Sequence, residues 1–496
     1  MKIIIPASGV GKRFQAAGYT DTKPLIQVTE DKKIIDFVVD CFDKENDEFF
    51  FITSPATHDV MQSYIEKMGI NYKHFLATGP IPGPVASINK VRDELSKFIS
   101  SDDEVIVSYC DYGMKWDYEM FKQFLEDESP DIAVPCYTGY HPHLEHKENV
   151  YAVCKSYEGS VYEIIEKYDS KDRLNESWSA GCYYFKTFGL MQQSFDRVVK
   201  SGKMVNDEYY VSLACNEMCD DYLVKSFDYI EKFYQFGTPR DFEYAKNKLN
   251  IINNISNKHT SFKNTVVLSA GKGERFFNFG FAQPKPFIPL LETDFVTNIE
   301  EAFKDVETNI RFIGSDSHEK YWNMFNRDNV KLIPSNKIGA AYSYIQGASD
   351  LSGETLIVPC DLIAQHITDE FNLIKETADV IVFTSDPSEY CLNNKKSFAW
   401  VGGQDNVISD ITVKEYKQGN EMILIGSFWV RNNSFLIEQL HEIMDEKKSI
   451  NGEYYLDNAF VNMLNKKIKV HYVKLDNYLS MGTPDEYKEN KYWYEV

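Results

Sequence analysis

Short apolar runs alternate with amphipathic segments along the whole chain. In the first half, the runs with the length and content of buried strands occupy residues 2–7, 49–53, 104–110 and 131–137. Residues 57–69 and 118–127, which lie between them, have the apolar spacing of helices. This alternation predicts an α/β fold, in which a mostly parallel mixed sheet is flanked by helices. Ligands of such sheets bind at the carboxyl ends of the strands, so polar residues there are the first site candidates.

The same pattern occurs twice. Five residues recur after 262 positions: Gly9, Gly11, Arg13, Lys23 and Pro24 match Gly271, Gly273, Arg275, Lys285 and Pro286. Later matches keep their order while the offset falls to 250 and then 245, at Asp111 with Asp361, Asn206 with Asn451, and Gly237 with Gly482. The sequence therefore predicts two tandem domains, residues 1–252 and 263–496, joined by a polar linker at 253–262.

A glycine-rich turn follows the first apolar run of each copy. Glycines let backbone N–H groups approach phosphate oxygens, and the start of the next helix favours negative charge. The turn is neither a P-loop nor a dinucleotide fingerprint, since Phe14 and Phe276 stand where the third glycine would be. A tight strand–helix turn without a ligand would explain the glycines alone. It would not explain the arginine and the later Lys-Pro pair, which favour a polyphosphate site.

An aspartate ends a buried apolar run in each copy, at Asp111 and Asp361. Mg²⁺ prefers oxygen ligands and binds through one or two carboxylates together with phosphates, so both aspartates are candidate metal ligands. The alternative is an N-cap for the segment that follows.

Taken in order, these motifs resemble the sugar-phosphate nucleotidyltransferase superfamily, whose Rossmann-like domain is related to the GT-A fold. The closest pattern is that of the subgroup with RF…GY…KPL, CD, N-x-E-[FY]-Y and a terminal GTP-x-[DE], and it covers nearly the whole chain twice. The resemblance implies transfer of a nucleoside monophosphate from an NTP to a sugar phosphate or related small phosphate. Pyrophosphate would leave, Mg²⁺ or Mn²⁺ would assist, and the product would serve surface polysaccharide or other glycan synthesis. The subgroup favours CTP.

The resemblance also implies a role for individual residues. Nucleotide binding falls to Gly9, Gly11, Gly83, Gly271, Gly273 and Gly339, and phosphate and metal handling to Arg13, Lys23, Asp111, Arg275, Lys285 and Asp361. The acceptor side comprises Lys167, Gly181, Lys414 and Gly426. Many relatives carry a second metal-binding Asp before the terminal G-T, which this chain lacks; Glu208 and Glu453 are the substitute candidates.

Three histidines, His141, His143 and His146, suggest zinc as an alternative, but no cysteine or acid cluster completes the set. In the second copy, Asp386 and Pro387 match His141 and Pro142. The copies therefore differ where relatives border the acceptor, while the phosphate-handling residues are the same.

Composition narrows the classes of partner. The chain has 53 Lys+Arg against 75 Asp+Glu, a net charge of −22, which argues against nucleic acid. No apolar run has the length of a membrane span, and the first residues do not read as a signal peptide. Nine scattered cysteines fit reduced thiols, so a cytoplasmic enzyme is expected, with homo-oligomerisation left open.

Three hypotheses follow. Both copies are active nucleotidyltransferases with different acceptors, or one is active while the other senses nucleotide or has a structural role. The third is a GT-A glycosyltransferase that consumes a nucleotide sugar, which would normally show D-x-D where this chain has CDYG and CDLI.

Overall fold

The computed structural model describes residues 1–145, 151–254, 261–290, 293–324, 327–335, 338–387, 389–450 and 452–494. The chain divides into two compact units, Met1–Asn250 (the first unit) and Ile251–Glu495 (the second unit). Of the predicted linker 253–262, residues 255–260 lie outside the described residues. Residues 253–254 end helix α9 (Pro239–Asn254), and 261–262 begin strand β13 (Ser261–Ser269).

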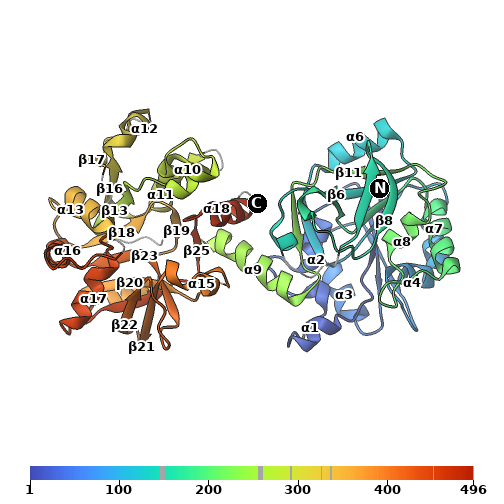
Figure 1. Ribbon diagram of the computed structural model, residues 1–496. Helices are drawn as coiled ribbons and strands as arrows, with labels where there is room; N and C mark the ends of the chain where they lie inside the picture. Colours follow the sequence, from blue (N-terminus) through green and yellow to red (C-terminus); the bar gives the residue numbers. More distant parts are fainter. Residues whose placement is uncertain are drawn as a thin grey trace. The chain divides into compact units, whose positions relative to one another are not determined.

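The first unit is built on a ten-stranded mixed sheet of order β11-β8-β7-β9-β6-β10-β4-β1-β2-β3 (Figure 1). Its parallel part comprises β1 (Lys2–Pro6), β2 (Glu48–Thr53), β3 (Tyr72–Leu76) and β4 (Val105–Ser108). The remaining strands are β6 (Ile132–Tyr137), β7 (Val153–Tyr157), β8 (Ser160–Ile165), β9 (Ser177–Ser179), β10 (Cys182–Phe185) and β11 (Val224–Phe227). The alternation predicted from the sequence is confirmed.

In the first sheet β11 also pairs with β6. The second unit repeats the resulting central strand order, with β17-β16-β13-β18-β23-β20-β24 in place of β3-β2-β1-β4-β10-β6-β11. Its sheet adds β22 (Val407–Val413) and β21 (Ala399–Gln404) to β16 (Glu307–Ser315), β17 (Val330–Ile333), β18 (Thr355–Pro359), β20 (Val380–Ser385), β23 (Met422–Val430) and β24 (His471–Lys474). The predicted fold class, two tandem Rossmann-like domains, is thus confirmed.

Helices cover both faces of each sheet, because alternate residues of a buried strand point to opposite sides. On β1, Ile4 packs with one face of helices, while Ile3 and Ile5 pack with the other. One face of the first unit carries α4 (Pro84–Lys90), α7 (Phe188–Ser201) and α8 (Val211–Asn216), and the other α2 (Ile34–Val39), α3 (His58–Ile65) and α6 (Tyr118–Glu128). The second unit has α13 (Ala340–Ala348), α16 (Asn433–Asp445) and α17 (Asp457–Asn465) on one face and α11 (Phe295–Ala302), α12 (Glu319–Met324) and α14 (Asp369–Lys375) on the other.

A second small sheet in each unit holds the two halves of the candidate site together. In the first unit, β5 (Tyr112–Lys115) pairs antiparallel with β12 (Lys232–Gln235). In the second, β19 (Leu362–Ala364) pairs with β25 (Tyr478–Ser480), before the closing helix α18 (Pro484–Tyr494). Asp111 and Asp361, which directly precede β5 and β19, are thereby placed beside the terminal G-T motif, although more than a hundred residues separate them from it in sequence.

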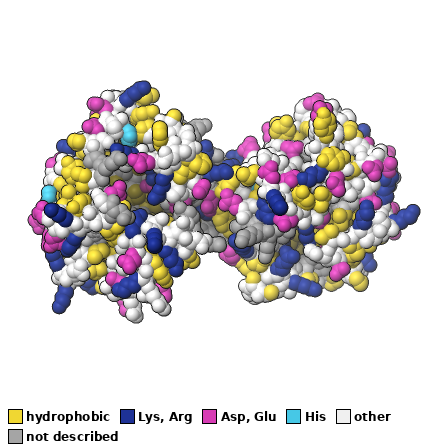
Figure 2. All heavy atoms as spheres, viewed as in Figure 1, with side chains coloured by type: hydrophobic (Ala, Val, Ile, Leu, Met, Phe, Trp, Pro, Cys, Tyr) yellow, Lys and Arg dark blue, Asp and Glu magenta, His cyan; other side chains and the backbone are white. Residues whose placement is uncertain are grey.

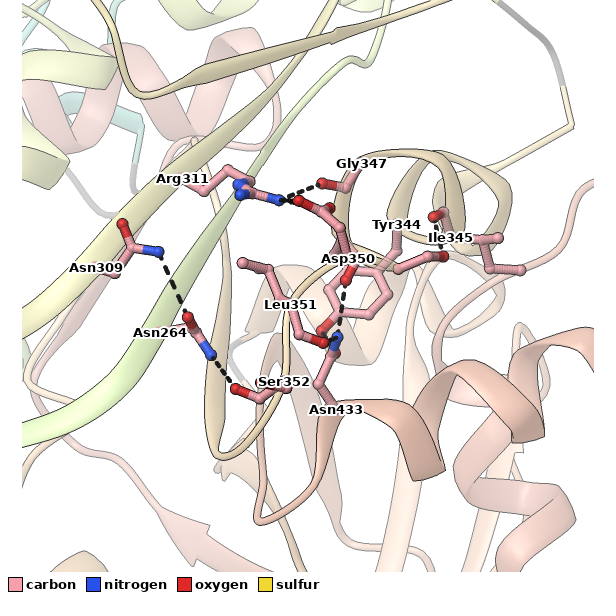
Figure 3. Close-up of polar contacts among 12 residues, drawn as sticks. Asn264, Asn309, Arg311, Tyr344, Ile345, Gly347, Asp350, Leu351, Ser352 and Asn433 are labelled. Atoms are coloured by element: carbon pink, nitrogen blue, oxygen red, sulfur yellow. Dashed lines mark hydrogen bonds and ion pairs between the residues drawn. The ribbon is translucent and has the colours of Figure 1, made fainter.

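The core of the second unit contains a buried polar cluster at the end of β18 opposite the candidate site (Figure 3). Asn433 is fully buried; its amide donates to the carbonyl oxygens of Ala348 at 2.8 Å and Leu351 at 3.0 Å and accepts from Tyr344. The matching residues of the first unit, Ile88 and Phe188, are apolar and buried. The two positions have changed together, so that the buried amide has its partners.

Candidate active site

A lysine–aspartate ion pair lies at the carboxyl end of β4 in the first unit. Lys23 Nζ is 2.6 Å from Asp111 Oδ2 and donates a hydrogen bond to the carbonyl oxygen of Gly237 at 3.0 Å. The ammonium also lies 5.2 Å from the centre of the ring of Phe14, which is buried. The lysine of the Lys-Pro pair, the strand-end aspartate and the terminal G-T motif thus meet at one point.

The second unit repeats this arrangement. Lys285 pairs with Asp361, donates to the carbonyl oxygen of Gly482 at 3.4 Å and lies 5.4 Å from the ring centre of Phe276. Burial opposes the charge of Lys285, but the Asp361 carboxylate outweighs burial and raises the pKa of the lysine. The contacts of the site are therefore duplicated in the two units, as well as the sequence motifs.

The glycine-rich turn approaches the Lys-Pro turn closely. Gly11 and Gly273 have φ of 61° and 65°, and a Cβ there would lie 3.2 Å and 2.8 Å from the Cβ of the respective lysine. A Cβ on Gly9 or Gly271 would meet nothing within 4 Å. The second glycine is therefore needed for packing, whereas the first leaves its backbone open to a ligand.

The arginine after the turn and a second lysine carry positive charge to the other side of each site. Arg13 and Arg275 are exposed. Burial lowers the pKa of Lys167 and of Lys414, and the charge of the respective arginine lowers it further. Both lysines have positive φ, 56° and 58°, at the end of equivalent strands. Each unit thus holds three cationic groups, which suits an anionic ligand with several phosphates.

The two base-loop glycines contact the N-x-E-Y-Y segment. A Cβ on Gly83 would lie 2.8 Å from the carbonyl oxygen of Tyr209, and one on Gly339 would lie 2.5 Å from that of Tyr454. Tyr209 N donates to the carbonyl of Pro82 at 3.0 Å, and the second unit has the equivalent bond. The nucleotide-binding role of both glycines stays a prediction; their visible contact is with this backbone.

Glu208 and Glu453 lie on the side of the second lysine. Each accepts a hydrogen bond from the tyrosine two residues later, at 2.5 Å from Tyr210 and 2.8 Å from Tyr455. The charge of Glu208 acts on Lys167, whose ammonium donates to Tyr210 at 2.8 Å. These contacts favour a role for both acids in positioning the second lysine over the metal role considered from sequence.

The acid of the terminal GTP-x-[DE] motif, to which no role was assigned from the sequence, faces Asp361 in the second unit. Glu486 Oε2 and Asp361 Oδ2 lie 3.3 Å and 3.4 Å from the point where a Cβ on Gly482 would be. Burial, and then the charge of Asp361, raise the pKa of Glu486. The equivalent Asp241 accepts from Thr238 at 2.8 Å. Two carboxylates beside Gly482 form an oxygen donor set of the kind that Mg²⁺ prefers.

The histidine stretch does not form a metal centre in the described chain. His143 Nε2 hydrogen-bonds the hydroxyl of Tyr137 at 3.1 Å, and burial lowers the pKa of His141 to about 4. His146 lies outside the described residues. No group of three or more His, Cys, Asp or Glu among the described residues could hold a metal ion.

Two further observations concern the surface. Basic and acidic side chains are interspersed over both units on the face shown in Figure 2. Among the described helices, none has the length and apolar content needed to cross a membrane.

The chain is similar in part to curated proteins. It is 27% identical over 233 residues to the bifunctional protein GlmU of Methanocaldococcus jannaschii, covering 46% of this chain and 53% of that one. With GlmU of Methanococcus maripaludis it shares 23% over 218 residues, covering 43% and 49%. The chain therefore spans about half the length of the curated relatives that it matches.

A solved nucleoside-diphosphate-sugar pyrophosphorylase from Vibrio cholerae matches 49% of this chain and 99% of its own, with 17% identity and a TM-score of 0.41. No family model matches the chain. The chain thus repeats one set of motifs and contacts in two units, and over about half of its length it is similar in sequence to bifunctional GlmU proteins.

Proposed function

We propose that the chain is a tandem-domain nucleotidyltransferase that transfers a nucleoside monophosphate from an NTP to a small phosphorylated acceptor. The observation that carries the proposal is the duplicated constellation of lysine, aspartate and G-T carbonyl, opposite an arginine and a second lysine. CTP is the proposed donor, on the subgroup resemblance, and a sugar phosphate for glycan synthesis is the proposed acceptor.

The residues present suit this reaction. An oxygen of the acceptor phosphate attacks the α-phosphorus, the bond to the β-phosphate oxygen breaks, and pyrophosphate leaves. A phosphate dianion is already nucleophilic, so the protein must chiefly position the groups and neutralise charge. Arg13 and Lys23, or Arg275 and Lys285, hold the departing pyrophosphate, while Lys167 or Lys414 holds the acceptor phosphate.

Asp111 and Asp361 are the proposed ligands of a divalent cation, with Glu486 as a second carboxylate in the second unit. When bound, Mg²⁺ would supply charge neutralisation at the phosphates. The lysine ammonium pairs with the aspartate and so compensates the charge of that carboxylate.

The test is pyrophosphate release with each NTP and a panel of sugar and polyol phosphates. Asp111→Asn and Asp361→Asn, made singly, should each abolish the activity of one unit by about 100- to 1,000-fold, as expected for losing a charge-stabilising group. Asp379→Asn removes an exposed acid that pairs only loosely with Arg431, at 3.5 Å, and serves as the control.

The outcomes separate the hypotheses. Loss in only one single variant, for every acceptor, would indicate one active unit. Release of a nucleoside diphosphate from a nucleotide sugar, without pyrophosphate, would indicate a glycosyltransferase. Full activity of both single variants and of the double variant would refute the role given to the aspartates.

A further inference from the structure

A carboxyl group lies beside the second lysine in both units, but it comes from a different element in each. In the first unit it is Glu166, directly before Lys167, and it accepts a hydrogen bond from Ser212 at 2.5 Å. The residues that match Glu166 and Ser212 in the second unit are Val413 and Asp457. The acid has thus moved from the strand side of the pocket to the start of α17.

The electrostatic setting of the two acids is similar. Burial raises the pKa of Glu166 to about 7 and that of Asp457 to about 6, and in both cases the neighbouring lysine opposes the shift. The residue that matches each acid in the other unit is uncharged, Val413 for Glu166 and Ser212 for Asp457. Each unit therefore keeps a buried carboxylate beside the lysine, in addition to Glu208 or Glu453, but the element that carries it differs.

Asp457 opens onto a cavity of about 240 Å³ in the second unit. The cavity is also lined by Lys414, Tyr455 and Gly426, and it extends to Asp361. The carboxylate therefore lies in the space that joins the acceptor lysine to the strand-end aspartate. A molecule whose phosphate lies between those two residues would place its remaining atoms against Asp457.

The opposite wall of the pocket differs as well. In the first unit, a Cβ on Gly181 would lie 2.8 Å from the ring of Tyr109. In the second, the nearest atom to a Cβ on Gly426 belongs to Pro359, at 3.7 Å. Both glycines have similar φ, 78° and 83°. The second unit therefore has free space where the first has an aromatic ring.

We propose, on the basis of the function proposed above, that Asp457 is a specificity-determining residue of the second unit, where it accepts a hydrogen bond from a hydroxyl group of the acceptor. The acid comes from the end of a strand in the first unit and from α17 in the second, and Tyr109 lies beside Gly181 where the second unit has free space. Because of these two differences, the two units take different polyhydroxylated phosphates. The geometry favours the bulkier acceptor for the second unit.

The donor on the acceptor is a neutral hydroxyl and not an ammonium group. Asp457 and Asp361 line this pocket together with Lys414. Arg275 and Glu453 act on Lys414, and Lys285 pairs with Asp361. These three cations and three acids already balance, so an additional ammonium would be repelled by the nearby lysine, whereas a hydroxyl adds no charge.

The experiment uses the full chain with Asp111→Asn, so that only the second unit turns over. Asp457→Ser introduces the first-unit residue, and Asp457→Asn keeps an oxygen that can accept. We expect Asp457→Ser to raise the acceptor KM at least about tenfold, the discrimination of one lost hydrogen bond to a charged group, with the KM for NTP unchanged. Asp457→Asn should recover part of the loss, and Val413→Glu with Asp457→Ser should shift the acceptor preference toward that of the first unit.

Binding is measured separately by thermal shift with glucose 1-phosphate, glycerol 3-phosphate, phosphocholine and inorganic phosphate. The hydroxylated phosphates should stabilise the parent chain more than the other two do, and Asp457→Ser should reduce that difference to the part contributed by the first unit. An unchanged series in Asp457→Ser, or the strongest shift with phosphocholine, would overturn the inference. Absence of pyrophosphate release alongside the expected binding series would refute the proposed reaction alone.

Discussion

Substitution of Gly339 by alanine should detach the N-x-E-Y-Y segment of the second unit. The residue has φ 116° and ψ 177°, a conformation essentially restricted to glycine, so alanine costs about 1–3 kcal/mol there. Its Cβ would lie 2.5 Å from the carbonyl oxygen of Tyr454 and 2.7 Å from the amide nitrogen. These are backbone atoms that cannot rotate away, so the segment itself must move.

That movement breaks two backbone hydrogen bonds, from Tyr454 N to Ile338 O at 2.7 Å and from Ala341 N to Tyr454 O at 3.0 Å. At about 0.5–1.5 kcal/mol each, their loss adds about 1–3 kcal/mol to the backbone strain. The second unit should therefore lose about 2–6 kcal/mol. Because Asp457 lies three residues after Tyr454, the acceptor KM of this unit should rise as well.

Gly419→Ala is the matched control. Gly419 also has positive φ, 96°, but its Cβ would meet nothing within 4 Å, so only the backbone strain applies. Urea unfolding of the full chain, followed by tryptophan fluorescence, and acceptor kinetics compare the two variants. If they differ by less than about 0.5 kcal/mol in unfolding free energy, the assumed contact between Gly339 and the segment is wrong.

Three further outcomes are expected. Tyr344→Phe leaves the buried oxygen of Asn433 without its donor and should cost about 1–3 kcal/mol in urea unfolding, with unchanged KM values; a loss below about 0.3 kcal/mol would contradict this. Burial raises the pKa of Glu166 from 4.5 to about 7 in the folded chain, so stability is highest below pH 4.5 and falls as the pH rises from 4.5 to about 7. Glu166→Gln should therefore gain unfolding free energy relative to the parent as the pH rises from 5 to 8, by about 2.5 kcal/mol, and a constant difference would refute the raised pKa. Gly181→Ala and Gly426→Ala incur similar backbone strain, but only the methyl group added at Gly181 meets an aromatic ring. Gly181→Ala should therefore lose about 1–3 kcal/mol more unfolding free energy in urea than Gly426→Ala, and equal losses would argue against that contact.

The sequence predicted the fold because its signal is local and occurs twice. Runs such as residues 2–7 and 104–110 are strands in the structure, as β1 and β4, since their apolar residues are buried on both sheet faces. The motifs placed Lys23 and Asp111 at one site. The Lys-Pro motif and the strand-end aspartate do not show, however, that the Lys23 ammonium binds both the Asp111 carboxylate and the carbonyl oxygen of Gly237.

The features that escaped prediction depend on contacts between distant residues. An acid that caps a helix looks the same in sequence as one that faces a site, so Glu486 gave no signal of its position beside Asp361. The exchange of Glu166 for Asp457 is visible in an alignment of the two halves. Its meaning requires knowing that Glu166 and Ser212, 46 residues apart, are hydrogen-bonded.

The lysine–aspartate ion pair has a consequence for the order of binding. A cation that binds Asp111 or Asp361 must compete with an ammonium group tethered to the same site, so its affinity for the ligand-free chain is reduced. A triphosphate gives that ammonium another anionic partner and removes the competition. Cation and nucleotide should therefore strengthen each other's binding by the same factor, as thermodynamic linkage requires. The resting chain thereby selects the cation–nucleotide complex over either component alone.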